Sequence, residues 1–363
     1  MNFNDYSWKE IIERNSNIVF WGMGKKFDSF IQTRTEWSRY TRIIIDNDKS
    51  RSGKLICGKG YEIPVVSLDT FIERYNSSDF LLIISVGVKN IPGIIEQINK
   101  YPILSNINYC IADFIIEKDH NIQESCRKYP SSFKITRTPL IPKKIHYCWF
   151  GKGKIPEKNL NWMKSWQRYC PDYEIIRWDE SNYDFKKNRF MREAYDAGKW
   201  GFVPDYARFD IIYHEGGIYL DTDVELIKNI DDLLYQDGFM GTEDGKYVSP
   251  GLGFGSIKNN DFIKELMGLY KDISFDINNM IPSPTFLLNF FKQKGWDMKG
   301  NYKRLNGMTI LPEKVLSPKN NRTGSIFVIP QTYSIHHFDG SWVDDTEKTD
   351  LHKGFNVFKQ IHK

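Results

Sequence analysis

Short apolar runs alternate with amphipathic stretches in the first third of the chain. The runs, which are rich in Ile, Val, Phe and Trp, cover residues 17–21, 42–45, 80–86 and 107–111. Runs of this length with helical patterns between them are typical of strands in a parallel sheet whose faces are covered by helices. We therefore predict a small α/β domain over residues 1–135.

The pattern of polar and apolar positions changes near residue 130. Residues 128–139 are polar and contain Pro130 and Pro139, which interrupt helices and strands alike. We place a domain boundary in this segment and assign residues 140–363 to a second domain. Apolar positions at helical spacing after residue 350 predict that this domain ends in a helix.

The second domain again alternates between strand and helix patterns. A strand, an amphipathic helix and a second strand in succession predict a parallel pair with a right-handed crossover. A later helix begins at a proline, ends at a glycine pair and leads straight into a short strand. The predicted elements are helices over 159–169 and from Pro204 to Gly216, and strands over 145–150, 173–178, 218–220, 308–311 and 326–329, with one more near Phe239. Together they predict a mixed sheet.

Charge and aromatic content narrow the class of ligand. The 363 residues include 50 Lys and Arg against 46 Asp and Glu, a net charge of +4. This small, evenly spread excess argues against a protein that binds nucleic acid by neutralising phosphates. Aromatic residues make up 15% of the chain, and such side chains serve cores but also stack on bases and sugar rings.

Cysteine usage and hydropathy predict a location. The five cysteines are scattered without CxxC or Cys/His metal spacing, which favours reduced thiols in a cytoplasmic protein. No apolar run approaches the roughly 18 residues of a membrane span, and the residues after Met1 do not resemble a signal peptide. We therefore expect a cytoplasmic protein, with peripheral contact at the inner membrane left open.

The triplet Asp221-Thr222-Asp223 is the sharpest chemical feature of the sequence. It follows an apolar strand, and two carboxylates one residue apart where a strand ends can both reach one hard divalent cation. Mg2+ and Mn2+ prefer such oxygen ligands and commonly keep positions for substrate phosphates. Because surface loops also contain such triplets, the motif alone does not decide between a metal site and an ordinary loop.

A helix just before the triplet adds an acid and a base. Asp205 and Arg208 are three residues apart, so they share one face of that helix. The helix leads through Gly216 and Gly217 into the strand that carries the acidic pair. A simple intrahelical ion pair would explain Asp205 and Arg208 alone, but the combined pattern favours a functional site.

Four segments together resemble glycosyltransferase family 32. They are VPDYAR at 203–208, YHEGGIYLDTD at 213–223, IPKKIHYCWFG at 141–151 and YSIHHFDGSW at 333–342. The family includes fungal mannosyltransferases and bacterial capsule and lipopolysaccharide sugar transferases. The catalytic domains of the large clostridial glucosylating toxins carry a similar pattern. The resemblance covers residues 141–343.

This resemblance implies a GT-A fold, a nucleotide-sugar donor, a Mn2+ or Mg2+ cofactor and retention of anomeric configuration. It implies that Trp149 stacks on the donor base and that Asp205 and Arg208 hold the donor sugar, with Arg208 also near the phosphate. It further implies that Asp221 contacts the ribose or sugar and a metal-bound water, and that Asp223 ligates the metal directly.

The closing motif supplies further candidates. Either His336 or His337 would lie over the metal or diphosphate; we expect only one in the site and favour His336. Ser341 and Trp342 would contact the departing phosphate, and Tyr219 either lines the same pocket or faces the core. The family's donor loop falls at 249–253, where this chain has Pro-Gly instead of the asparagine-like residue that we expect.

The sequence thus predicts a retaining, metal-dependent hexosyltransferase. It would move a hexose or N-acetylhexosamine from a UDP-sugar, in preference to a GDP-sugar, to a glycan or lipid-linked acceptor of capsule or lipopolysaccharide. Two alternatives stay open. One is a haloacid-dehalogenase-like phosphatase with Asp221 as nucleophile, which would also need Lys246 and Asp344-Asp345; the other is a non-catalytic protein of glycan assembly.

The first domain contains an incomplete dinucleotide-binding loop. Gly22 and Gly24 follow a strand and open a helix, and Asp46 lies at the end of the next strand, but Phe27 replaces the third glycine. The loop resembles those of small Rossmann-like domains attached to bacterial polysaccharide enzymes. We favour a structural or acceptor-positioning module over a working NAD site.

Overall fold

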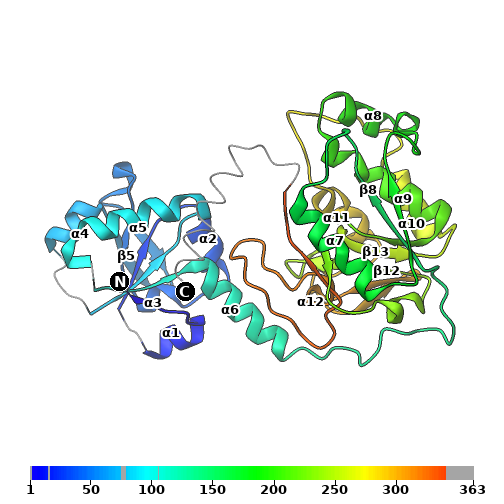
Figure 1. The fold of residues 1–363 in the computed structure, drawn as a ribbon. Helices are drawn as coiled ribbons and strands as arrows, with labels where there is room; N and C mark the ends of the chain where they lie inside the picture. The colour runs from blue at the N-terminus through cyan, green and yellow to red at the C-terminus, as the bar shows by residue number, and fades with distance from the viewer. Residues whose placement is uncertain (1, 15–16, 75–78, 105, 341–363) are drawn as a thin grey trace. The chain divides into compact units, whose positions relative to one another are not determined.

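The computed structural model describes residues 2–14, 17–74, 79–104 and 106–340 (Figure 1). The described chain forms two compact units. The first unit comprises residues 2–127 with Arg322–Gly324, and the second unit comprises residues 128–321 and 325–340. Each has its own sheet and its own hydrophobic core, so each is described by itself.

The first unit is built on a seven-stranded sheet of order β1-β7-β6-β2-β3-β5-β4. Its strands are β1 (Asn2–Phe3), β2 (Ile18–Trp21), β3 (Thr41–Ile45), β4 (Leu55–Gly58), β5 (Tyr61–Val66), β6 (Leu81–Ile84) and β7 (Asn108–Ile111). All neighbours pair in parallel except β4 with β5. The chain moves outward from β2 to β5 on one side, then crosses to β6 and β7 on the other. This is the doubly wound, Rossmann-like order, with its switch point between β2 and β6.

Helices cover both faces of this sheet: α1 (Trp8–Arg14), α2 (Lys25–Gln32), α3 (Trp37–Tyr40), α4 (Leu68–Arg74), α5 (Ile91–Lys100) and α6 (Ala112–Ser125). Two separate hydrophobic clusters result. Phe27 and Phe30 of α2 belong to one cluster, and Phe71 of α4 and Ile94 of α5 belong to the other. Strands β2 and β6 are buried on both faces, which explains why their sequences are continuously apolar.

The second unit contains a mixed seven-stranded sheet of order β14-β15-β12-β13-β10-β8-β9. Its strands are β8 (Lys144–Cys148), β9 (Glu174–Trp178), β10 (Gly217–Tyr219), β12 (Gly238–Glu243), β13 (Tyr247–Ser256), β14 (Lys303–Leu305) and β15 (Met308–Leu311). Strand β8 pairs in parallel with both β9 and β10, as the strand-helix-strand pattern predicts. A separate antiparallel pair joins β11 (Val224–Leu226) to β16 (Ser334–His336).

The helices of the second unit are α7 (Glu157–Tyr169), α8 (Arg189–Asp196), α9 (Pro204–Glu215), α10 (Asp261–Gly268), α11 (Ser283–Gln293) and α12 (Glu313–Leu316). Helix α9 is buried along most of its length, so its apolar residues face several directions and its Asp205 and Arg208 are enclosed as well. Gly216 and Gly217 both have positive φ, which lets the chain turn from α9 directly into β10.

The predicted α/β class is confirmed, but one predicted strand is wrong. Residues 326–329 form no strand and only an isolated bridge between Ile326 and Lys319. Ile326 and Val328 are about half exposed, so their alternation does not mark a sheet face. The predicted C-terminal helix after residue 350 lies outside the described residues.

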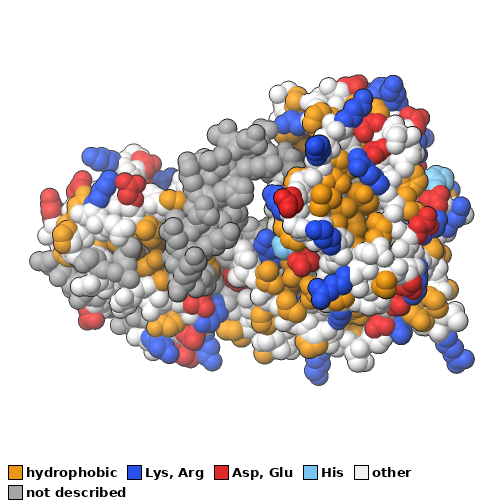
Figure 2. Space-filling view, viewed as in Figure 1, with side chains coloured by type: hydrophobic (Ala, Val, Ile, Leu, Met, Phe, Trp, Pro, Cys, Tyr) orange, Lys and Arg blue, Asp and Glu red, His pale blue; other side chains and the backbone are white. Residues whose placement is uncertain are grey.

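The face shown in Figure 2 carries acidic and basic side chains interspersed among hydrophobic ones, without a stripe of one sign. In the part of the chain that the structure describes, no helix is both long enough and apolar enough to cross a membrane.

Candidate functional site

The acidic triplet lies between β10 and β11 of the second unit. Strand β10 pairs in parallel with β8 through Tyr219 and His146, so the carboxyl ends of the two strands lie at one edge of the sheet. Asp221-Thr222-Asp223 therefore leaves the sheet where Trp149 follows β8. Such edges are where open α/β sheets bind ligands.

Three potential ligand groups converge there. One ligand atom each from Asp221, Asp223 and His336 lie within 4.8 Å of one another. His336 Nε2 is 3.2 Å from Asp223 Oδ1, and the backbone N–H of Asp339 donates to Asp223 Oδ2 at 2.8 Å. Burial acts to raise the pKa of Asp223, but His336 and the Asp339 N–H outweigh it and lower this pKa to about 2. Asp223 is therefore held as a carboxylate.

The residues present fit a divalent cation. His336 Nδ1 is buried without a hydrogen-bond partner among the described residues, which is a costly arrangement unless something binds near the ring. The pKa of His336 is raised because, although burial opposes charge on the ring, Asp223 and Asp221 favour it. Two carboxylates and one imidazole suit a Mn2+ or Mg2+ site that keeps positions for a further ligand.

The two adjacent histidines point to opposite sides. His336 pairs with Val224 in the β11–β16 ladder and faces Asp223. His337 Nε2 lies 2.9 Å from Glu225 Oε2, and the ring stacks on Trp162 at 4.1 Å between centroids. The structure therefore places His336, and not His337, beside the acidic pair.

Helix α9 brings Asp205 and Arg208 to the same place. Both are buried, and an Arg208 guanidinium nitrogen lies 3.2 Å from Asp205 Oδ1 and 3.7 Å from Asp221 Oδ1. Arg208 Nε also donates to the Pro204 carbonyl at 2.9 Å, which fixes the orientation of the guanidinium group. Burial raises the pKa of Asp205 to about 7, although Arg208 acts in the opposite direction. The Arg208 guanidinium thus links helix α9 to the acidic triplet.

Comparison with known proteins indicates the protein family that the segment around the acidic triplet resembles. Residues 156–240 match the family model of the glycosyltransferase sugar-binding region containing a DXD motif. This segment is similar to that family. The resemblance found in the sequence is thereby confirmed, and the DXD motif is Asp221-Thr222-Asp223.

Curated relatives match only part of their own length. Inositol phosphoceramide mannosyltransferase 3 of Schizosaccharomyces pombe is 32% identical over 154 residues, which cover 41% of this chain and 39% of that protein. A mannosyl phosphorylinositol ceramide synthase of Saccharomyces cerevisiae is 28% identical over 233 residues, 60% of this chain and 59% of that protein. The chain spans about a third to two fifths of the three Schizosaccharomyces relatives. A solved structure, PaToxG glycosyltransferase, has 16% identity and a TM-score of 0.33, covering 51% of this chain and 70% of that one.

Two predicted donor contacts differ in how they approach the DXD motif. The Tyr219 ring is only 1% exposed, and its hydroxyl donates to Asp221 Oδ1 at 3.0 Å, so it positions the first acid of the motif. Trp149 is half-buried, and its indole N–H donates to the Gly153 carbonyl at 2.7 Å. Direct donor contacts by either residue stay predictions. Ser341 and Trp342 lie outside the described residues.

The structure explains why the expected asparagine-like residue is missing from the 249–253 segment. This segment belongs to strand β13, and Gly251 lies directly over the DXD motif. A Cβ at Gly251 would lie 2.6 Å from Asp221 Oδ2, so any larger residue would displace that carboxylate. The sequence showed the glycine, but only the packing of β13 against β10 shows its reason.

Sequence reasoning missed Glu243, at the end of β12. Burial raises its pKa to about 7, while His336 acts to lower it. Its electrostatic coupling to His336 places a further carboxyl group near the DXD site. No motif in the sequence marks this residue, because β12 reaches the site through pairing with β13 rather than through proximity in the chain.

The phosphatase alternative receives no support. It needs Lys246 and Asp344-Asp345 as partners of Asp221, and the aspartate pair lies outside the described residues. The Asp221 carboxylate is instead engaged by Tyr219 and Arg208, and the surrounding segment matches a sugar-transferase family.

Proposed function

We propose that the second unit is a glycosyltransferase that moves a hexose from a nucleoside diphosphate sugar with the help of a divalent cation. The observation that carries this proposal is the convergence of Asp221, Asp223 and His336, with an unpartnered imidazole nitrogen, inside a DXD-family segment. When bound, the cation would neutralise charge that develops on the departing diphosphate.

The residues of this chain would orient the donor. Arg208 is buried and fixed by three oxygen partners, so its charge is available at a defined place without reorganisation. Tyr219 and the Asp339 N–H hold the two acids of the motif. We propose transfer with retention, in which the departing phosphate oxygen accepts the proton of the acceptor hydroxyl. No protein side chain is then required as the base.

We propose a hexose as the transferred sugar and a glycan or lipid hydroxyl as the acceptor. The relatives are named as mannosyltransferases that act on inositol phosphoceramide, which supports a lipid-linked acceptor. Those names lend no support to the capsule or lipopolysaccharide acceptor favoured from the sequence. A UDP donor, N-acetylhexosamine transfer and a cytoplasmic location with peripheral membrane contact remain proposals, and fractionation of expressing cells tests the last.

The test is slow donor hydrolysis by the full chain with manganese. UDP-glucose, UDP-galactose, UDP-N-acetylglucosamine and GDP-mannose are offered separately, and we expect one donor to be cleaved in a chelator-sensitive manner. Asp223→Asn should abolish cleavage, whereas Asp261→Asn, an exposed aspartate at the start of α10, should not. Cleavage that persists in saturating chelator would refute the cation's role. A lack of cleavage with every donor would favour the non-catalytic alternative.

A further inference from the structure

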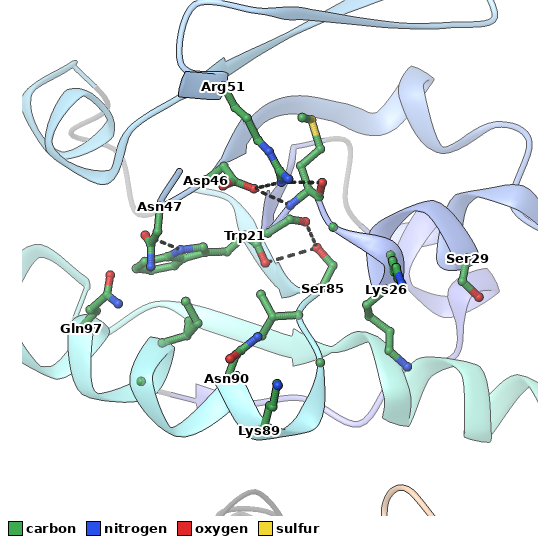
Figure 3. A pocket seen from close by; sticks show the side chains of 18 of the residues that line it. Trp21, Lys26, Ser29, Asp46, Asn47, Arg51, Ser85, Lys89, Asn90 and Gln97 are labelled. Atoms are coloured by element: carbon green, nitrogen blue, oxygen red, sulfur yellow. Dashed lines mark hydrogen bonds and ion pairs between the residues drawn. The ribbon is translucent and has the colours of Figure 1, made fainter. Parts of the chain in front are cut away.

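A cavity of about 870 Å3 opens in the first unit, far along the chain from the DXD site. Its walls come from the segment after β2, the segment after β3, the segment after β6 and helix α5 (Figure 3). These strand ends flank the switch point of the sheet, between β2 and β6. Open α/β sheets bind ligands in the crevice at this point.

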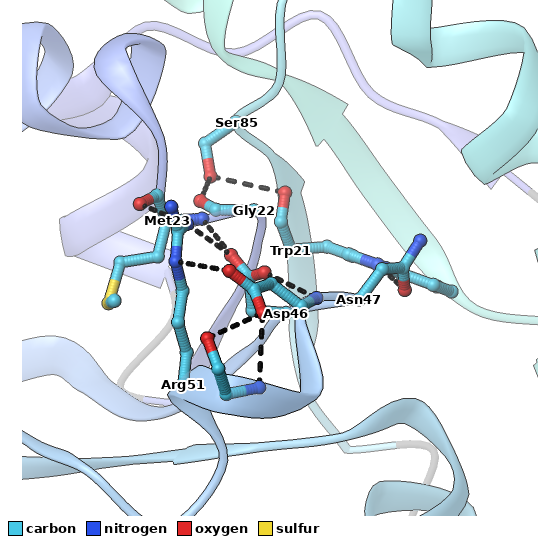
Figure 4. A network of polar contacts seen from close by, with 9 residues as sticks. Trp21, Gly22, Met23, Asp46, Asn47, Arg51 and Ser85 are labelled. Carbon is cyan, nitrogen blue, oxygen red and sulfur yellow. Dashed lines mark hydrogen bonds and ion pairs between the residues drawn. The ribbon is translucent and has the colours of Figure 1, made fainter.

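The loop between β2 and α2 is held rigidly beside the cavity (Figure 4). Asp46 accepts from the Met23 N–H at 2.7 Å and from Arg51 at 3.1 Å, and Arg51 donates to the Met23 carbonyl at 2.8 Å. The Ser85 hydroxyl donates to the Gly22 carbonyl at 2.7 Å. Side chains from two neighbouring strand ends therefore fix the loop before any ligand arrives.

The glycines of this loop leave room for a ligand. Gly22 has φ +104°, and a Cβ there would lie 2.3 Å from Val86, so only glycine fits. Gly24 precedes α2 and does not cap it with a side chain, and no atom of the described residues lies within 4 Å of where its Cβ would be. The start of α2 thus faces open space at the cavity wall, an arrangement that favours a negatively charged group.

The charged lining also favours an anion. Lys25 and Lys89 are exposed at the cavity, and neither makes an ion pair with another described residue. Lys26 lines it as well and is paired with Asp113 at 2.6 Å. The acidic group in the lining is Asp46, whose carboxylate is already occupied by the Met23 and Asp48 N–H groups and Arg51.

The opposite end of the cavity has a different character. Figure 3 shows Asn47 and Gln97 there, away from Lys26 and Ser29. Asn47 Oδ1 accepts from the Trp21 indole at 3.3 Å, which leaves its amide nitrogen available as a donor. With the apolar wall of Val86 and Ile94, these amides form a surface suited to the edge and face of a nucleobase.

The loop departs from a dinucleotide-binding loop at one position. Phe27, at the position of the third glycine, is 1% exposed and packs edge-on against Phe20 at 5.2 Å, so it belongs to the core. Asp46, the acid that would accept ribose hydroxyls, is occupied within the protein, so recognition of any nucleotide here would rest on the phosphates and the base.

We propose that this cavity binds a nucleoside diphosphate group, with the phosphates over Gly24 beside Lys25 and Lys89 and the base between Asn47 and Gln97. The proposal goes beyond the proposed function, because it adds a second nucleotide site in the other unit. The free diphosphate and the nucleotide-sugar share this chemistry, so both are tested.

The experiment uses full-length Asp223→Asn protein in chelator, which weakens cation-dependent binding at the DXD site. UDP, GDP, UDP-glucose, GDP-mannose, NAD and inorganic diphosphate are titrated by calorimetry. We expect one of the nucleotides to bind with one-to-one stoichiometry, at least tenfold tighter than NAD and inorganic diphosphate. Tighter binding of the sugar-bearing form would identify the donor as the ligand, equal binding would show that the site recognises the shared nucleoside diphosphate, and weaker binding would identify the free diphosphate. No nucleotide binding, or tighter binding of NAD or diphosphate, would overturn the proposal.

Matched variants assign the binding to the cavity. Gly24→Glu fills open space at φ −105° and adds a negative charge, so nucleotide binding should weaken at least tenfold. Gly268→Glu, at an equally open glycine in the second unit, should have no effect. Lys25→Gln with Lys89→Gln should also weaken binding tenfold, and the exposed Lys100→Gln should not. Unchanged binding in Gly24→Glu contradicts the proposal. Donor hydrolysis by Gly24→Glu with Asp223 intact shows separately whether the DXD site works.

Discussion

The two units use an aspartate at a strand end in opposite ways. In the first unit, Asp46 follows β3, and its carboxylate accepts hydrogen bonds from two backbone N–H groups and from Arg51. In the second unit, Asp223 follows β10 and faces His336, whose Nδ1 is buried and unpartnered. Position at the carboxyl edge of a sheet is therefore not enough to assign chemistry. What differs is the set of partners: Asp46 pairs with an arginine of its own unit, whereas Asp223 lies within reach of a second carboxylate and an imidazole, a set of groups that suits a divalent cation.

The sharpest test of this contrast is the same substitution in both units. Asp223→Asn should lower donor hydrolysis at least about a hundredfold, because it removes a carboxylate that would hold the cation needed to neutralise charge on the departing diphosphate. Asp46→Asn should change the rate of donor hydrolysis by less than about twofold, since all the partners of the Asp46 carboxylate lie in the first unit. Steady-state hydrolysis with manganese measures both. Comparable losses in the two variants would mean that the contrast is mistaken.

Acid should destabilise the second unit through His146. This residue is fully buried between Trp178 and the Gly216 carbonyl, and burial lowers its pKa to about 4. The unfolded chain binds a proton near pH 6.5, so stability falls as pH drops below 6.5 and stops falling through this group at about 4. The loss is at most about 3 kcal/mol.

His146→Gln isolates that contribution. Glutamine can keep both hydrogen bonds but does not titrate, so the variant's free energy of unfolding should vary less between pH 6.5 and 4 than the wild type's. Denaturant unfolding at a series of pH values gives both curves. Parallel curves would assign the acid sensitivity to other groups.

Asp46→Asn should lower the stability of the first unit by about 2 kcal/mol. An amide group would place an N–H against donors that now point at a carboxylate, and Arg51 would lose its buried partner. Urea unfolding followed by circular dichroism measures the loss. Asp69→Asn, at the exposed start of α4, serves as the control and should cost less than about 0.5 kcal/mol.

The smallest expected effect compares neighbouring histidines. His336→Gln should raise the manganese concentration for half-maximal hydrolysis about tenfold, because the ring adjoins the acidic pair. His337→Gln should change it less than twofold, since that ring lies against Glu225 and Trp162. A larger shift for the His337 variant would reverse the assignment drawn from their orientations.

The sequence could predict features that depend on neighbours along the chain. Helix α9, its glycine turn and the acidic triplet after β10 lie within about 20 residues, and their order alone places Asp205 and Arg208 near Asp221. Features that depend on distant packing were missed. Gly251 and Glu243 reach the site through sheet pairing, and the cavity of the first unit depends on how separate loops meet. The apolar run at residues 326–329 is typical of a strand, but among the described residues this segment makes only one isolated bridge.

The β11–β16 pair has a consequence for the order in which the site forms during synthesis of the chain. Asp223 and its backbone partner Asp339 are 116 positions apart, and β16 is the last described strand. A ribosome releases the chain from its first residue onward, so the acids emerge long before the segment that carries His336 and Asp339. Prematurely terminated products ending in α11 or α12 would carry the whole DXD motif yet lack the imidazole. In such products the site would lack both His336 and the Asp339 N–H that hold Asp223.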